Sequence, residues 1–354
     1  MLNPARGAFS GALAPGPGRT RRPRVGRFQT LRLIVLNKAT LPLYFTKIAW
    51  RLTAGLGGLL LLGAHPMQAQ SNAPPALAFK AGTNGAFGFD TGALRGVLRA
   101  NGKSVGLQSV THLASGKRLD QSMGLFSHYR VFTTGQRYGA GAWDWPSTAQ
   151  LTDRGAVEVL WPATAERPFE LRALYRWATP TALDLETVVT ARTNLAKFES
   201  FLACYFSAGF TNALAATGGD AVPKGTPLYL PARPTAGEWQ MFPRDDAAIR
   251  VIQDGRWQLP PNPVAWTIRP RFSQPVAIRY DEASQLAAVV MGRRAECFAL
   301  AMPHETEGHR SLYLAQFGRD LKAGETARAQ ARLVILDRTH PPRYGQAWLD
   351  FNGP

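Results

Sequence analysis

An alternation of apolar and polar residues with a period of two sets the limits on how this chain can fold. In the segment 169–178 (FELRALYRWA), apolar side chains occupy every second position from Phe169 to Trp177, and mostly charged residues lie between them. A second alternating run, 182–192 (ALDLETVVTAR), follows the turn at 179–181. Successive side chains of a strand point to opposite faces, so the two runs predict an antiparallel hairpin.

The same alternation recurs along the rest of the chain. It is found at 156–161, 247–253, 265–272, 275–281, 286–292, 296–302, 311–317 and 331–336, with Gly, Pro, Asp or Asn in the gaps. From Ala76 onward no long helical stripe of apolar residues is present. Many short strands at regular spacing predict an all-β protein built as a sandwich or barrel of antiparallel sheets.

The formal net charge of +17 is concentrated at the N-terminus and is not typical of a nucleic-acid-binding surface. Residues 1–69 hold ten of the 41 Lys and Arg residues and no acidic residue, and the first carboxylate is Asp90. The remaining chain has 31 basic and 24 acidic residues, a net charge of +7. No basic cluster in it matches a nucleic-acid-binding motif. We therefore expect no nucleic acid among its partners.

Residues 47–69 have the order of a secretory signal peptide. Lys47 and Arg51 precede an apolar run of thirteen residues, Leu52–Ala64, and the small residue Ala69 suits a signal-peptidase site. Thirteen residues fall short of the roughly 20 that a membrane-spanning helix needs. We expect cleavage near this point, no membrane span after processing, and a periplasmic or secreted location in a bacterium.

The same pattern divides the chain into parts. Residues 1–46, rich in Arg, Gly and Pro, are expected to be a disordered extension or the product of an over-long gene model. Residues 47–69 are the expected signal peptide, and residues 70–354 are the expected single β domain. Within that domain the Gly-, Pro- and Ala-rich connection 211–239 has the composition of a loop that covers a site.

Two short motifs resemble a known family. The run 183–210 contains Thr193-Asn194 at the end of one strand and Tyr205-Phe206 at the end of the next. It is similar to the centre of the galactose mutarotase-like (aldose 1-epimerase) superfamily, where a "tN" turn leads to a strand closing on "NHxYFN". The run 321–336 resembles the "L-x-P-G-E" turn and closing strand of that family, with Ala323 replacing the proline. The resemblance implies a large antiparallel β-supersandwich and a carbohydrate ligand.

The chain departs from this family at the catalytic positions. Ala203 stands where the resemblance places a histidine that acts as general acid. The general-base glutamate of the family aligns near Ala301, and Glu305 lies beyond it. Since mutarotation requires an acid and a base within reach of the sugar, we do not expect this activity.

A stretch from residue 127 to residue 147 holds the densest mixture of aromatic and charged side chains. Its candidate site residues are His128 for catalysis and, for ligand binding, Tyr129, Arg130, Arg137, Tyr138, Trp143, Asp144 and Trp145. In the segment WDWPS two tryptophans flank a carboxylate. This pattern is compatible with a saccharide-binding wall and also with a strand end buried against the core. Because Pro146 ends the strand there, we expect that the two tryptophans are not both buried.

Two further segments supply candidates. At the exit of the long loop, Trp239, Arg244 and Asp245 are candidate ligand-binding residues, and the turn 303–310 offers His304 and Glu305 as candidate acid or base. Neither an HExxH motif nor a Cys/His cluster points to a metal, and no nucleotide or nucleophile-elbow motif is present, so we expect no cofactor. Cys204 and Cys297 lie in apolar strands, and the sequence leaves their pairing open.

Three functions are compatible with these features. The first is an exported protein of mutarotase-like fold that recognises a saccharide or polysaccharide. The second is a glycoside hydrolase or polysaccharide lyase on the same scaffold. The third is a non-catalytic structural or interaction module of the cell envelope. An open cleft lined by the candidate residues would favour the first two, and tryptophans sealed in a core would favour the third.

Overall fold

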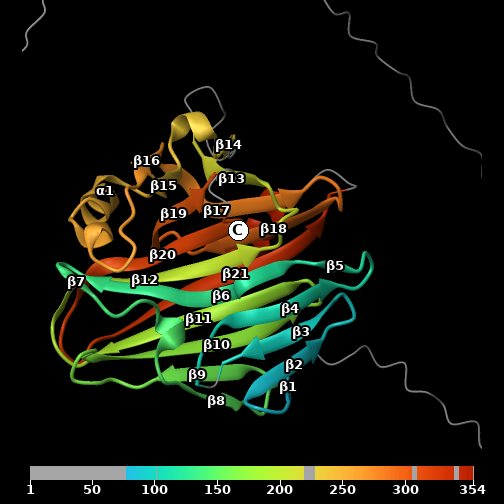
Figure 1. Ribbon diagram of the computed structural model, residues 1–354, viewed down its shortest axis with the longest axis horizontal. Coiled ribbons are helices and arrows are strands. Elements are labelled where there is room, and N and C mark those ends of the chain that lie inside the picture. Colours follow the sequence, from blue (N-terminus) through green and yellow to red (C-terminus); the bar gives the residue numbers. More distant parts are fainter. Residues whose placement is uncertain (1–76, 101, 219–227, 305–308, 339–342, 354) are drawn as a thin grey trace, which may run out of the picture. The chain divides into compact units, whose positions relative to one another are not determined.

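Two large β-sheets form the part of the chain that the structure, a computed structural model, describes. That part comprises residues 77–100, 102–218, 228–304, 309–338 and 343–353. The predicted extension (1–46), the predicted signal peptide (47–69) and Glu305 lie outside the described residues. The all-β class predicted from the alternation is confirmed (Figure 1).

The first sheet has twelve strands among the described residues and is antiparallel except for one pair, β15 and β16. Its main path runs β1-β2-β3-β4-β6-β12-β20-β19-β15-β16, with β5 paired to β4 and β7 to β6. The strands are β1 (Lys80–Ala81), β2 (Ala86–Asp90), β3 (Leu94–Arg99), β4 (Gly106–His112), β5 (Lys117–Arg118), β6 (Asp120–Thr133), β7 (Gln136–Arg137), β12 (Leu195–Phe206), β15 (Trp239–Pro243), β16 (Thr267–Ile268), β19 (Cys297–Pro303) and β20 (Ser311–Leu321).

The second sheet has nine strands in the described part of the chain, in the order β14-β13-β17-β18-β21-β11-β10-β9-β8. The strands are β8 (Thr148–Leu151), β9 (Val157–Trp161), β10 (Phe169–Thr179), β11 (Ala182–Ala191), β13 (Asn212–Thr217), β14 (Leu228–Pro231), β17 (Phe272–Asp281), β18 (Leu286–Gly292) and β21 (Thr326–Asp337). Short helices connect or cover the sheets: α1 (Asp246–Ile252), α2 (Tyr344–Asn352) and the 3-10 turns η1 (Ala142–Asp144), η2 (Pro234–Ala236) and η3 (Arg256–Gln258). None of the described helices is long and apolar enough to cross a membrane.

The predicted hairpin is formed by β10 and β11. Its register pairs Leu171 with Val189 and Tyr175 with Leu185, and the chain turns at Pro180-Thr181. The alternate apolar residues of both strands are buried and the charged residues between them are more exposed. The period of two in the sequence therefore correctly predicts which face of this hairpin is buried.

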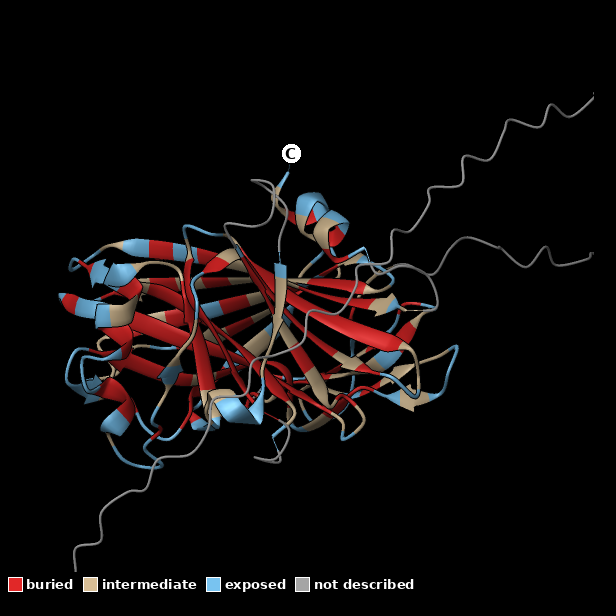
Figure 2. Cartoon of the chain, turned by 90° about the horizontal axis from the view of Figure 1, so that it is seen from above, coloured by how far each residue is buried: buried red, intermediate tan, exposed pale blue. Residues whose placement is uncertain are grey.

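Apolar side chains form three layers. The largest cluster lies between the two sheets and takes residues from both, such as Leu202 of β12 and Leu185 of β11. A second cluster covers the opposite face of the first sheet, beneath α1 and η3, and a third covers the opposite face of the second sheet, beneath α2. Figure 2 shows the buried residues running along the strands of both sheets. Each sheet is thus covered on both faces over part of its area.

The two turns that carry the family resemblance lie side by side. The side-chain Oδ1 of Asn194, between β11 and β12, accepts a hydrogen bond from the backbone N–H of Ala323, between β20 and β21, at 2.9 Å. Both motifs therefore lie where the chain passes from one sheet to the other.

One predicted strand is a helix. Of the segment 247–253 (AAIRVIQ), all but the C-cap Gln253 lies in α1, and its buried residues Ala248, Val251 and Ile252 recur at helical spacing. The carboxylate of Asp245 accepts the N–H of Ala248 at 2.8 Å and caps the helix. A cap followed by apolar residues three and four apart outweighed the short alternating pattern.

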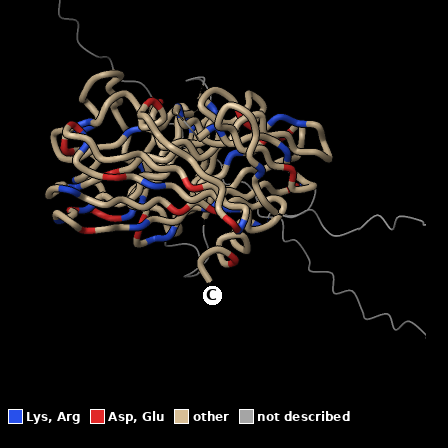
Figure 3. Tube along the Cα trace, turned by 90° about the horizontal axis from the view of Figure 1, so that it is seen from below, with Lys and Arg blue, Asp and Glu red and all other residues tan. Residues whose placement is uncertain are grey.

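Charged residues of both signs alternate on the outer face of the second sheet. Arg172 lies between Glu158 and Glu170, and Arg332 donates to Asp184 at 2.6 and 3.0 Å. Figure 3 shows this mixture of Lys and Arg with Asp and Glu along the strands.

The two cysteines are both buried and free, so Cys204 and Cys297 are not joined by a disulfide bond.

Candidate functional site

A cleft of about 310 Å³ lies on the face of the first sheet that points away from the second sheet. Strands β6, β12, β15 and β20 form its floor, and η3 with the segment after it forms one wall. Most of the lining is aromatic. The lining residues are Tyr129, Arg130, Phe201, Tyr205, Trp239, Trp257, Asn262, Pro263, Val264, Trp266, His309 and Tyr313.

A β-bulge in β6 directs two consecutive side chains into this cleft. Val131 pairs with Ser200 of β12 and His128 pairs with Leu202, so that Tyr129 and Arg130 together oppose the single residue Phe201. A bulge of this kind places two neighbouring side chains on one face of the sheet. Strict alternation would have sent one of the two into the space between the sheets.

Arg130 is buried at the base of the cleft, with 3% of its surface exposed. Its guanidinium lies 5.0 Å from the ring centre of Tyr129 and 5.2 Å from that of Trp257. Nη2 donates to the carbonyl oxygen of Asn262 at 2.8 Å, whereas Nε and Nη1 have no acceptor among the described residues. The site therefore holds a fixed positive charge with N–H groups left to donate.

Three tryptophans from three different elements meet at the wall of the cleft. The ring of Trp266 is nearly perpendicular to those of Trp239 (5.6 Å, 86°) and Trp257 (5.2 Å, 84°). Trp257 is buried, whereas Trp239 and Trp266 keep part of their surface exposed. Edge-to-face contacts of this kind fix the rings against one another and leave their remaining faces open for a ligand.

A chain of hydroxyl groups runs along the floor. Ser311 donates to the hydroxyl of Tyr313 at 2.9 Å, and Tyr313 donates to the hydroxyl of Tyr205 at 3.4 Å. Burial, together with the neighbouring Tyr313, raises the pKa of Tyr205 well above its ordinary value. Tyr205 is therefore a neutral phenol whose proton is left for an acceptor in the cleft.

His309 lies at the exposed rim. Its ring is 6.3 Å from that of Tyr205 and 5.8 Å from that of Trp239. The backbone here is held by the buried Arg279, which donates to the carbonyl oxygens of Ser311, Pro303 and His309. The imidazole ring is thus placed at the rim of the cleft, beside Tyr205 and Trp239.

A buried ionic network lies beside the cleft, below Trp257. Nη1 of Arg256 donates to Glu199 at 2.9 Å, and Nη2 and Nε donate to Asp254 at 2.8 and 3.0 Å. Burial raises the pKa of Glu199 to about 7, which Arg256 only partly offsets. Burial alone would lower the pKa of Arg256, but the hydrogen bonds and charges of Asp254 and Glu199 raise it. Because one guanidinium is shared by two carboxylates, the negative charge of Glu199 is only partly neutralised.

Of the residues predicted from the sequence, Tyr129, Arg130 and Trp239 line the cleft. Arg137 supports its wall, because its guanidinium donates to the carbonyl oxygens of Gly139, Ala140 and Pro261. Tyr138 packs against the core residue Phe169.

The predicted acid and base candidates are placed elsewhere. His128 lies between the sheets, where Nε2 contacts the Thr187 hydroxyl at 3.0 Å and burial lowers the pKa of the imidazole to about 3. His304 is buried at the end of β19, next to a separate small pocket. Glu305 lies outside the described residues.

The expectation that Trp143 and Trp145 are not both buried is wrong, since each has 7% of its surface exposed. The turn η1 separates them. Trp143 stacks on Tyr129 at 4.3 Å behind the cleft, and Trp145 enters the core between the sheets. Asp144 is exposed and pairs with Lys103 at 3.3 Å. Pro146 ends the segment without exposing either tryptophan, because the helical turn sends the two rings to different layers.

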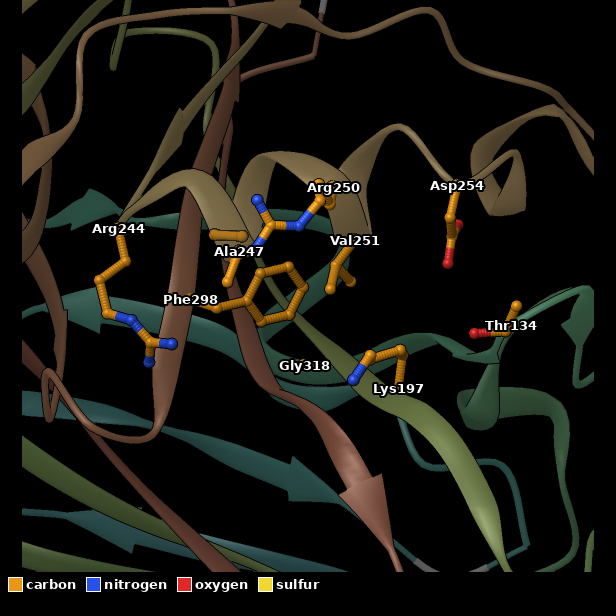
Figure 4. A pocket seen from close by; sticks show the side chains of 10 residues that line it. Thr134, Lys197, Arg244, Ala247, Arg250, Val251, Asp254, Phe298 and Gly318 are labelled. Atoms are coloured by element: carbon orange, nitrogen blue, oxygen red, sulfur yellow. The ribbon is translucent and has the colours of Figure 1, made fainter.

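Arg244 belongs to a second pocket, of about 350 Å³, beside α1. Figure 4 shows the basic side chains Lys197, Arg244 and Arg250 around Phe298. Arg244 donates to Asp245 at 2.8 Å, and Lys197 pairs with Asp320 at 3.3 Å. Two of these three cations thus have acidic partners, and Arg250 is exposed to solvent, whereas Arg130 of the aromatic cleft is buried.

Several lining residues were not among the ligand-binding residues predicted from the sequence. Trp257 closely follows the Asp-Gly turn signal at 254–255, and Trp266 and Tyr313 follow ordinary alternating patterns. Alternation along β12 places Phe201 and Tyr205 on the same face of the sheet. No local pattern shows that this face forms a cleft. Among the described residues, no three His, Cys, Asp or Glu side chains gather as a metal site would require.

Comparison with known proteins gives matches of fold only. No family model and no curated protein matches the chain. Among solved structures, a galactose mutarotase-like protein from Lactobacillus casei is 12% identical, with 71% of this chain and 100% of that chain covered and a TM-score of 0.45. Galactose mutarotase-like structures are therefore among the matches.

Two larger carbohydrate-active enzymes also match. A heparan sulfate lyase from Pedobacter heparinus is 8% identical over 76% of this chain and 38% of its own, with a TM-score of 0.43. An alpha-N-acetylgalactosaminidase from Bifidobacterium bifidum is 11% identical over 75% of this chain and 38% of its own, with a TM-score of 0.46. The chain spans less than half the length of either enzyme.

Proposed function

We propose that this protein binds a saccharide in the cleft of its first sheet. The observation that carries the proposal is the set of partly exposed rings, Trp239, Trp266 and Tyr129, around a small number of fixed polar groups. A pyranose has apolar C–H faces that pack on aromatic rings and hydroxyl groups at its edge that need hydrogen-bond partners. Arg130 and Tyr205 provide such partners at the floor.

The size of the cleft agrees with this proposal. Its volume of about 310 Å³ is at the lower end of the range for small-molecule sites, roughly 300–1,000 Å³. The lining comes from strands that are hydrogen-bonded in one sheet, so most of the surface is pre-formed. A pre-formed aromatic cleft loses little conformational freedom when a ligand enters.

A glycan array followed by calorimetry on the glycans retained tests the proposal. Trp239→Ala should lower the affinity for those glycans about tenfold, because it removes one stacking surface, and it should leave the melting temperature nearly unchanged. Trp348→Ala is the matched control, since Trp348 is also partly buried but lies in α2 on the second sheet. Absence of any retained glycan, or equal affinity of the Trp239 variant, would contradict the proposal.

Catalysis on the bound glycan is a second candidate function. It is favoured by one observation, the His309 imidazole beside the Tyr205 phenol in the same cleft. These two groups could move a proton to and from a sugar held between them. Mass spectrometry of glycans incubated with the protein would reveal products, and His309→Ala should abolish turnover while binding persists. Unchanged glycans after long incubation would exclude this function for the sugars tested.

We also propose that the protein acts outside the cytoplasm. The support is the order of basic, apolar and small residues at 47–69 in the sequence. Cell fractionation with N-terminal sequencing tests it, and the expected mature N-terminus is close to Gln70. Recovery of the intact 47–69 segment on exported protein would contradict cleavage.

A further inference from the structure

Arg130 forms no ion pair with a carboxylate among the described residues. Its charge acts to lower the pKa of the buried Glu199, but that carboxylate is bound by Arg256, which also holds Asp254. Arg130 itself makes one hydrogen bond, to the carbonyl oxygen of Asn262, and two cation–aromatic contacts. A buried charge without a counter-ion is costly to maintain, because the surrounding protein replaces water without replacing its favourable interactions.

Two further N–H donors belong to the lining of the cleft. The indole N–H groups of Trp257 and Trp266 are buried and have no acceptor among the described residues. No Asp or Glu is among the described residues that line the cleft. The cleft therefore combines unpaired N–H donors with one full positive charge and no carboxylate, which favours a ligand that supplies acceptors and negative charge.

We propose that the ligand of this cleft is an acidic sugar, a pyranose that carries a carboxylate or a sulfate ester. This inference rests on the saccharide-binding function proposed above. Arg130 binds the anionic group through its Nε and Nη1 N–H groups, and Trp239 and Trp266 pack against the sugar ring. An arginine is suited to this task because its planar guanidinium stays charged and matches the geometry of oxyanions.

The fold around Arg130 favours this assignment. The β-bulge fixes the direction of its side chain, and the rings of Tyr129 and Trp257 hold the guanidinium. Trp143 in turn stacks on Tyr129 at 4.3 Å. The positive charge is thus held in place before any ligand arrives, which lowers the entropic cost of binding.

Matched ligands that differ only in charge test the inference. Trigalacturonate is compared with its methyl ester, and galactose 6-sulfate with galactose, by calorimetry on the wild-type protein. We expect tighter binding of at least one charged member, about tenfold or more over its neutral counterpart. Preference for carboxylate or for sulfate then identifies the source of the charge. Equal or weaker binding of both charged members overturns the inference.

Two variants assign the discrimination to Arg130. Arg130→Met should reduce affinity for the charged ligand about tenfold or more and reduce affinity for the neutral one clearly less, so that the preference for the charged ligand is lost, and Arg130→Lys should recover only part of the loss. Arg250→Met, which removes an exposed arginine beside α1, is the control for net charge. Loss of discrimination in the control but not in the Arg130 variants contradicts the assignment, and if neither Arg130 variant folds, the wild-type comparison decides.

The two proposals fail in different ways. If neutral glycans are retained on the array and charged ones are not preferred, the saccharide-binding proposal stands and the acidic-sugar inference falls. If no glycan of either kind is retained, both fall. If charged glycans bind equally to wild type and to Trp239→Ala, the anion is bound without the aromatic cleft, which contradicts both proposals.

Discussion

At the scale of single residues, the two tryptophans of the WDWPS segment show how neighbouring side chains take different roles. Trp143 supports Tyr129 behind the cleft, and Trp145 packs between the sheets, 6.0 Å from Phe169 and with Arg167 4.3 Å from its ring. The two aromatic rings of this segment thus pack against other side chains. Asp144 between them is exposed to solvent.

Trp145→Ala should destabilise the protein by roughly 3 to 5 kcal/mol, because it opens a cavity in the core between the sheets. Thermal or denaturant unfolding measures this loss, and the affinity for ligand per folded molecule should not change. Trp143→Ala should lower both stability and affinity, because Tyr129 loses its stacking partner. A Trp145 variant with wild-type stability would show that the ring is not a core residue.

Ala203 gives a second prediction at this scale. It lies on β12 between Phe201 and Tyr205, which line the cleft, and its own side chain is buried on the same face. A methyl group cannot transfer a proton, so we expect no acceleration of galactose mutarotation. Polarimetry of freshly dissolved α-galactose measures this. Strong acceleration by the wild-type protein would mean that another residue supplies the acid.

At the scale of elements, the short helix α1 depends on its cap. Burial would raise the pKa of Asp245, but hydrogen bonds from Arg244 and from the Ala248 N–H outweigh it and keep the pKa below its ordinary value. Asp245 was predicted as a ligand-binding residue, and in the structure its oxygens are engaged in this capping arrangement. The helix covers part of the apolar face next to the cleft.

Asp245→Ala should lower the free energy of unfolding by about 1 kcal/mol, the usual effect of losing a helix cap. Asp245→Asn should retain most of the stability, since an amide oxygen can accept the same N–H. Denaturant unfolding of the three proteins provides the measurement. If Asn and Ala cost the same, the ion pair with Arg244 rather than the cap is the interaction that matters.

At the scale of the whole molecule, the buried pair of Glu199 and Arg256 links stability to pH. The pKa of Glu199 is raised from 4.5 to about 7, first by burial. Between these two values the folded protein retains a proton that the unfolded chain has lost. The stabilisation from this proton is complete below pH 4.5 and is lost as the pH rises through about 7.

Glu199→Gln should remove this dependence. The unfolding free energy of the wild type should fall relative to the variant by about 3 kcal/mol at most as the pH rises through this window. Thermal unfolding at a series of pH values measures the difference. A constant difference between the two proteins would show that Glu199 is ionised throughout, compensated by Arg256.

The sequence by itself determined the fold class and part of the strands. Period-two alternation is a local property, and it identified β9, the hairpin of β10 and β11, and β17 to β21. It did not identify β1 to β8 or β13 to β15, and it was wrong for the segment of α1, where a local cap favoured a helix. The turn motifs at Asn194 and Ala323 are also local, and the structure joins them by a hydrogen bond. The sequence also predicted Tyr129, Arg130 and Trp239 as ligand-binding residues.

Only the tertiary structure decided which side chains share a site. The cleft joins Arg130 of β6, Tyr205 of β12, Trp239 of β15 and the segment after η3, which are far apart along the chain. Their meeting depends on strand order, and the shared direction of Tyr129 and Arg130 depends on a bulge opposite Phe201. Strand order and bulges arise from pairing between distant strands, so no local pattern encodes them. For the same physical reason the burial of Trp143 and Trp145 could not be predicted, because the turn η1 directs the two rings into different apolar layers.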